Sequence, residues 1–238
     1  MDTIGHVQSR AAGAEVGTAE PVFLQSLTSS EVTGLRSRAI ERDFARGEAL
    51  FHQRGSPDRV YVVLTGFVKL SRLSDEGREV ILAIRGPGDL LGEQSAIDGS
   101  PRSATALTLD PVRALVLSAA DFVAFLQGEP HVALVVLRTL SHRLREADLE
   151  RVELSVQDTV ARVAKRINEL AERFGKESAG NVEIDLPISQ EELAGWTGCS
   201  RDSVVKALQT MRGLGWIETA RRRITVLDWD EIRLRAGH

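Results

Sequence analysis

The chain has 238 residues, of which 42% are hydrophobic and 27% charged, a composition typical of a globular protein of about two domains. No apolar run approaches the roughly 20 residues that a membrane-spanning helix needs, and the N-terminus lacks the basic and apolar segments of a signal peptide, so a membrane protein and a secreted protein are both disfavoured. The only cysteine, Cys199, cannot form an internal disulfide, which is typical of a protein in the reducing cytoplasm.

Charge is distributed unevenly along the chain, whose net charge is −4. Residues 159–238 hold 13 Lys and Arg against 12 Asp and Glu, whereas residues 1–158 hold 17 against 22. The acidic total argues against nucleic-acid binding by the whole surface. The small basic surplus of the C-terminal part therefore matters only if its cations lie together.

The first predicted elements are short. Residues 1–20 are small and polar, and we expect a disordered leader there. Residues 26–39 predict a helix, because Thr28 and Glu31 have the spacing of a capping box. Short runs rich in Val, Ile and Leu then recur between turn residues, with no helical pattern between them, and predict a small barrel, roll or sandwich. These runs are residues 60–66, 67–73, 79–86, 103–109 and 112–117.

A long helix is expected next. Residues 119–130 predict a short helix, and from His131 to about Arg173 the chain has neither proline nor glycine. Such a helix cannot bury both of its sides in one small domain, so we expect a second copy of the chain to pack against its free side as a dimer. An ordinary core helix is the alternative. The apolar positions with the spacing of a coiled-coil seam are Leu137, Leu140, Leu144, Ala147 and Leu154.

The stretch "SQEELAGWTGCSRDSVVKALQTM" predicts two short helices around a tight turn. Ser189 and Glu192 form a capping box for the first helix, Gly198 permits a left-handed turn, and Ser200 can cap the second helix. This pattern is specific to a helix-turn-helix, whose second helix enters the major groove of DNA. Cys199 lies in the turn with no Cys or His partner at metal spacing, so we expect it to be a packed residue. The buried face of the second helix is expected from Val204, Ala207, Leu208 and Met211.

The outer face of the second helix carries side chains that can read bases. Arg201 and Lys206 can donate to N7 and O6 of guanine, and Asp202 can accept from N4 of cytosine. A solvated helix end is the alternative. Residues 216–219 and 224–227 predict the strands of a wing, whose arginines lie in or near its turn and can contact phosphate. The expected DNA-binding residues are Gln190, Ser200, Arg201, Asp202, Ser203, Lys206, Arg221, Arg222 and Arg223.

A second motif, "GPGDLLGEQSAIDGSPRSATA", indicates a pocket for an anion. Gly92 allows close approach of the backbone, and Arg102 can bind a phosphate. Ser103 can donate a further hydrogen bond, and Glu93 suits a ribose hydroxyl. A structural Arg–Glu salt bridge is the alternative interpretation.

These features together resemble the cyclic AMP receptor protein (CRP/FNR) family of bacterial transcription regulators, over roughly Phe23 to Asp228. The resemblance implies an α+β chain: an N-terminal β-roll of the cyclic-nucleotide-binding type in residues 21–130, a dimerisation helix in 131–158 and a winged helix-turn-helix in 159–238. It also implies a homodimer that binds an inverted repeat of TGTGA-like half-sites on double-stranded DNA and works with RNA polymerase, away from the membrane.

The resemblance also assigns roles to residues. In cyclic-nucleotide-binding members, a Gly-Glu pair and an Arg-Ser pair hold the sugar and the cyclic phosphate, and they match Gly92, Glu93, Arg102 and Ser103 here. On the reading helix, the matching residues are Arg201, Asp202 and Lys206. Iron–sulfur members carry a cysteine cluster, which a chain with one cysteine lacks.

The base-contacting positions depart from the family pattern. A Thr-Ser pair on the dimer helix matches Ala147 and Asp148 here. Ala147 cannot form a side-chain hydrogen bond, whereas Asp148 can accept from the amino group of adenine or from N1 and N2 of guanine. The residues that match the phosphate and ribose contacts are present, while the altered base contacts leave the identity of the nucleotide open. From the resemblance we expect cAMP as the effector, with cGMP as an alternative.

Two other classes of function remain open. The chain could be a DNA-binding regulator that needs no nucleotide, or a nucleotide-sensing module that acts on a protein partner. An enzyme is not expected, because the sequence shows no Ser/His/Asp set, metal cluster or phosphate-binding loop.

Overall fold

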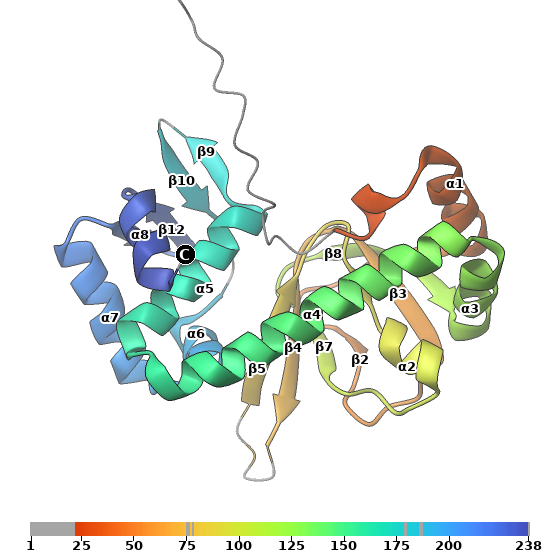
Figure 1. Cartoon of the computed structure of the whole chain (residues 1–238), viewed down its shortest axis with the longest axis horizontal. Coiled ribbons are helices and arrows are strands. Elements are labelled where there is room, and N and C mark those ends of the chain that lie inside the picture. The colour runs from red at the N-terminus through yellow and green to blue at the C-terminus, as the bar shows by residue number, and fades with distance from the viewer. Residues whose placement is uncertain (1–21, 75–76, 78, 179, 186–187, 238) are drawn as a thin grey trace, which may run out of the picture.

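The computed structural model describes residues 22–74, 77, 79–178, 180–185 and 188–237. For residues 151–156 it describes the backbone but not the side chains. The expected leader at residues 1–20 therefore lies outside the described residues. An N-terminal part built on two sheets and a C-terminal part built around a third are linked by one long helix (Figure 1).

The N-terminal part is a β-roll of two antiparallel four-stranded sheets. One has the order β1-β8-β3-β6, with bounds Ile40–Phe44, Val112–Ser118, Arg59–Thr65 and Leu90–Leu91. The other has the order β2-β7-β4-β5, with bounds Ala49–Phe51, Thr105–Thr108, Val68–Leu73 and Glu79–Arg85. The five expected strands are confirmed. β1, β2 and β6 were not expected, because β1 is mostly exposed and polar and the other two are very short.

Short helices cover the roll. They are α1 (Ser29–Arg38), α2 (Glu93–Asp98) and α3 (Ala119–Gly128), preceded by a 3₁₀ turn at Leu24–Ser26. The capping box of α1 is confirmed: Thr28 accepts from the N–H of Glu31, whose carboxylate accepts from the N–H of Thr28 at 2.7 Å. α1 and α3 thus begin where the sequence predicts, because their first turns are set by local hydrogen bonds.

The long helix of the sequence analysis is two helices. α4 (Pro130–Val156) and α5 (Thr159–Phe174) are separated at Gln157 and Asp158, and the Asp158 side chain caps α5. Among the described residues no single helix is long and apolar enough to cross a membrane. α3 and α4 meet that test only as a pair, and the chain bends by 113° between them.

The exposed seam of α4 differs in part from the expected one. Leu137 and Leu144 are 59% and 63% exposed and lie seven residues apart, hence on one face. Leu140 was expected beside them but is half-buried against the core of the roll. The side chain of Leu154 lies outside the described residues. Ala147 of the expected seam is also exposed. The large outward apolar residues of the described part of α4 are Leu134, Leu137, Leu144 and Leu149.

The C-terminal part is a winged helix-turn-helix packed on α5. Its remaining elements are β9 (Lys176–Ser178), β10 (Asn181–Ile184), α6 (Gln190–Thr197), α7 (Arg201–Gly213), β11 (Ile217–Ala220), β12 (Arg223–Val226) and α8 (Trp229–Ala236). α8 was not expected from the sequence, and its Ile232 and Ala236 are buried. The hydrophobic core of this part also contains Ile81, Ile84 and Leu109 of the roll, so one core spans both parts.

Candidate effector pocket and nucleic-acid interface

A pocket of about 190 Å³ lies in the β-roll beside α2 and α4. It brings together all four residues that the sequence analysis assigned to the sugar and the phosphate. Its wall also contains apolar side chains of β4 to β6 and two further arginines. The lining residues are Phe51, Leu70, Leu82, Ala83, Arg85, Leu91, Gly92, Glu93, Gln94, Ser95, Arg102, Ser103, Ala104 and Arg143.

Gly92 and Arg102 fit together in this wall. Gly92 has the left-handed φ of 81° at the N-cap of α2, and a Cβ at this position would lie 2.6 Å from Nη1 of Arg102. A larger residue would therefore be strained and would also displace the guanidinium. This geometry gives a physical reason for glycine in the motif "GE…PRSA".

Arg102 is only 2% exposed, and backbone carbonyls hold it. Its Nε donates to Ser56 at 3.1 Å, Nη1 to Gly92 at 2.9 Å and Nη2 to Arg59 at 2.5 Å. Burial lowers the pKa of Arg102 below its usual range, but the group stays charged because that range is so high. Since a guanidinium carries five N–H groups, an anion can bind without breaking these three bonds.

Glu93 pairs with an arginine that the sequence analysis missed. Its carboxylate is buried and accepts from Nη1 of Arg143 at 2.7 Å, while Nη2 of Arg143 donates to the carbonyl of Leu90 at 3.3 Å. Arg143 lies on α4, one helical turn before Ala147, and this spacing is the sequence signal that could have identified it. The pair joins the long helix to the wall of the pocket.

The two expected base contacts lie apart from these residues. Ala147 and Asp148 are exposed on α4 and do not line the pocket in the single chain. Ser103 does line it, next to Arg102. The structure thus brings Gly92, Glu93, Arg102 and Ser103 together, but not Ala147 and Asp148.

The helix-turn-helix has the local features that the sequence predicts. Ser189 and Glu192 form the capping box of α6, Gly198 has a φ of 64° in the turn, and Ser200 caps α7 by accepting from the N–H of Ser203 at 3.1 Å. The buried face of α7 is also as expected: Val204, Ala207, Leu208 and Met211.

The outer face of the helix-turn-helix is polar and accessible. Arg201, Asp202 and Lys206 are exposed on the first turns of α7, and Ser203 is half-buried beside them. Gln190 is exposed at the start of α6. The described face of α7 is therefore free to enter a major groove.

The three arginines of the wing differ in their surroundings. Arg221 and Arg222 occupy the turn between β11 and β12 and are exposed, and Arg222 has a left-handed φ of 60°. Arg223 begins β12, where it contacts Asp185 at 2.8 Å and Glu183 at 3.3 Å. The turn therefore presents Arg221 and Arg222, whereas Arg223 is held by neighbouring carboxylates.

Cys199 lies in the helix-turn-helix, half-buried, with its Sγ 3.5 Å from the carbonyl of Thr197. In the part of the chain that the structure describes, no group of three or more His, Cys, Asp and Glu residues is placed to hold a metal ion. The environment of Cys199 is that of a packed side chain.

Comparison with known proteins matches both parts of the chain. The family model described as "Cyclic nucleotide-binding domain" matches residues 41–129, and the one described as "Crp-like helix-turn-helix domain" matches residues 161–235. These ranges contain the pocket motif and the predicted reading helix.

Relatives match over most of their length. The chain is 33% identical over 214 residues to the CRP-like cAMP-activated global transcriptional regulator of Mycobacterium tuberculosis, covering 90% of this chain and 96% of that protein. It is 34% identical over 191 residues to the cyclic AMP receptor protein of Thermus thermophilus, covering 80% and 85%. A crystal structure of a CRP-family transcriptional regulator from Thermus thermophilus superposes with a TM-score of 0.69 at 26% identity, covering 83% of this chain and 97% of that one.

The first of these relatives and the solved structure are both described as transcriptional regulators. With its cyclic-nucleotide-binding domain and its Crp-like helix-turn-helix, the chain belongs to the CRP/FNR family of DNA-binding transcription regulators.

Proposed function

We propose that this regulator is a cytoplasmic homodimer whose binding to an inverted-repeat DNA site is controlled by a cyclic nucleotide, with cAMP as the effector. The observation that carries the proposal is the pocket that gathers Gly92, Glu93, Arg102 and Ser103 in one wall. An arginine fork with free N–H groups suits a cyclic phosphate, and a buried carboxylate suits a ribose hydroxyl. RNA polymerase is the proposed partner of the DNA-bound dimer.

The α4 helix supports control by a ligand. Arg143 ties α4 to Glu93, so a nucleotide that engages Glu93 acts on the helix that we propose as the dimer interface. A ligand can shift a protein between two states only by binding them unequally, and we propose that nucleotide binding changes this contact. We propose that Ala147 and Asp148 complete the base contact, which leaves cGMP as the alternative effector.

Titration calorimetry and DNA binding test this function together. We expect cAMP to bind, the non-cyclic 5′-AMP to bind much more weakly, and cAMP to raise affinity for a TGTGA-like inverted repeat by roughly 5- to 150-fold, the usual range of allosteric coupling. If cGMP binds more tightly than cAMP, cGMP is the effector. Specific DNA binding without any response to nucleotide would contradict the proposed control, and nucleotide binding without DNA binding would favour a protein partner.

Substitution of an exposed leucine tests the dimer. Leu144→Asp should shift the protein towards monomer in sedimentation velocity, because the interface would then bury a charge in place of an apolar side chain. Leu234→Asp is the matched control, since Leu234 is 70% exposed but lies on α8. A wild-type protein that sediments as a monomer at micromolar concentration would exclude this interface.

A further inference from the structure

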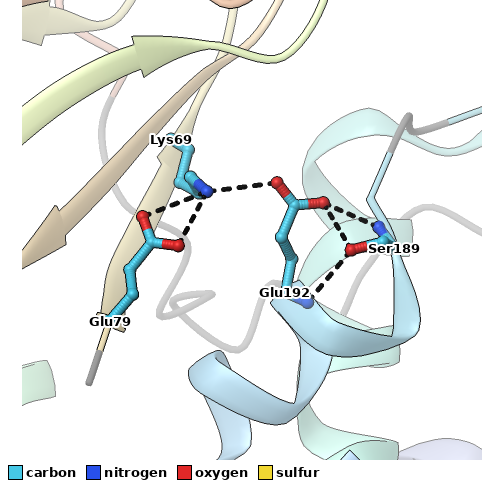
Figure 2. Close-up of polar contacts among 4 residues, drawn as sticks. All are labelled: Lys69, Glu79, Ser189 and Glu192. Atoms are coloured by element: carbon cyan, nitrogen blue, oxygen red, sulfur yellow. Dashed lines mark hydrogen bonds and ion pairs between the residues drawn. The ribbon is translucent and has the colours of Figure 1, made fainter. Parts of the chain in front are cut away.

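An ion bridge joins the β-roll to the first helix of the helix-turn-helix (Figure 2). Lys69 of β4 is buried, and its Nζ lies 3.1 Å from both carboxylate oxygens of Glu79 and 3.1 Å from Oε1 of Glu192. The other oxygen of Glu192 accepts from the N–H and the hydroxyl of Ser189, both at 2.8 Å. One carboxylate therefore caps α6 and binds the sensor at the same time.

The charge state of Glu192 suits this double role. Burial disfavours its ionised form, but the hydrogen bonds from Ser189 and the ammonium of Lys69 outweigh that effect and hold the pKa of Glu192 below its usual value. Glu192 is thus ionised at neutral pH, as an ion bridge requires.

A second bridge joins the β-roll to α5. Arg173 at the end of α5 contacts the buried carboxylate of Asp89 at 2.7 Å, and the same Asp89 oxygen accepts from the N–H of Gly86 at 2.7 Å. The ring of Phe174 packs edge-on against Phe67, with 4.9 Å between centroids. A Cβ at residue 86 would lie 2.6 Å from the Phe174 ring, which explains glycine at this position.

Both bridges start from chain segments that form the wall of the pocket. Leu70, the neighbour of Lys69 on β4, lines the pocket, and successive side chains of a strand point to opposite faces. Asp89 is followed three residues later by Gly92, which also lines it. Each bridge therefore connects a segment of the pocket wall to α6 or α5.

We propose that Lys69 and Asp89 are positioning residues that set the orientation of the helix-turn-helix according to the occupancy of the pocket. The inference rests on the proposed function and names the contacts that carry its control. Lys69 acts through Glu192 on α6, and Asp89 acts through Arg173 on α5. Rigid, buried contacts of this kind transmit small shifts because packed interfaces change between discrete arrangements rather than deforming gradually.

Glu192→Gln is the sharpest test. A glutamine can still cap α6, because its single oxygen can accept from Ser189, but its NH2 group then faces Lys69. The bridge thus loses both its charge and its hydrogen bond to Glu192, while Lys69 keeps Glu79 as a partner. Glu191→Gln is the matched control, since it removes the same charge from the exposed neighbouring position. The readout is the ratio of DNA affinities with and without saturating cAMP, which a purely structural contact would leave unchanged.

We expect Glu192→Gln and Lys69→Met each to reduce this ratio at least about fivefold, with the double variant no worse than either single one, as for two residues that act through one contact. Lys69→Arg should restore most of the ratio. An unchanged ratio in Glu192→Gln, beside a wild-type protein that responds to cAMP, would overturn the inference and leave the proposed function standing.

Amide hydrogen exchange distinguishes a failure of the proposed function from a failure of the inference about Lys69. In the protein without nucleotide, Lys69→Met should speed exchange of residues 190–197 by about tenfold, because α6 loses its anchor on β4, whereas Glu191→Gln should not. If the wild-type protein shows no response to cAMP or cGMP, the proposed function fails, and the exchange result alone decides whether Lys69 positions α6. Equal exchange in Lys69→Met and wild type would show that it does not.

Discussion

Arg201→Ala is expected to cost roughly 1–3 kcal/mol of binding to the specific site and to relax the preference for one base pair in each half-site. Arg201 is the first residue of α7, directly after the Ser200 cap, and it is exposed. Its fork can donate to N7 and O6 of one guanine, a contact that no other base offers in the same form. Affinity would be measured on a TGTGA-like inverted repeat and on a scrambled duplex at several salt concentrations.

Arg222→Gly is the contrasting variant. It removes a cation from the wing turn at a residue with a φ of 60°, where glycine is free of strain, so the fold should not lose stability. Because a phosphate contact carries no sequence information, binding should weaken about equally on both duplexes and with a smaller salt dependence. If Arg201→Ala keeps the full ratio between the two duplexes, α7 is not the reader, and the proposed DNA contact is wrong.

Arg102→Ala is expected to weaken cyclic-nucleotide binding by about 1.5–3 kcal/mol, the range for a hydrogen bond to a charged group. It should also lower the melting temperature, because the carbonyls of Ser56, Gly92 and Arg59 would lose their donor. Calorimetry must therefore be done well below the melting temperature of the variant.

Two companion variants separate binding from folding. Arg59→Ala is the control, since it removes an exposed arginine beside the same loop but keeps the carbonyl that Arg102 uses. Ser103→Ala removes a proposed ligand contact from an exposed side chain, and it should weaken nucleotide binding with little effect on melting. Undiminished affinity in folded Arg102→Ala would contradict the assignment of the phosphate site.

The helix-turn-helix was predictable because its determinants are local. The box between Ser189 and Glu192 and the left-handed Gly198 are set within a few residues of sequence, and both are as expected. α8 was missed although Asp228 and Glu231 have the spacing of a helix start, and Asp228 does cap it. The capping spacing was present, but the helix that follows has only eight residues and gives a short periodic pattern.

The contacts that join the parts of the chain could not be predicted in the same way. Lys69 and Glu192 are 123 residues apart, and no local pattern pairs one buried lysine with one capping carboxylate. Spacing could place Arg143 one helical turn from Ala147, but no local pattern pairs it with Glu93, which the roll places against it. Leu140 is half-buried against the core of the roll, a contact that its spacing alone could not reveal because that spacing fits both the exposed seam and this core.

The core shared by Ile81, Ile84 and Leu109 with the helix-turn-helix has a consequence for synthesis of the chain. The β-roll leaves the ribosome first and can fold before α5 and α6 exist, since domains generally fold from the N-terminus as they are made. Until those helices arrive, the apolar side chains of β5 lack the part of their cover that α5 and α6 supply. The nascent roll thus exposes an apolar surface that the rest of the chain later covers. A chain truncated after residue 158 would keep this surface exposed and would be prone to aggregate.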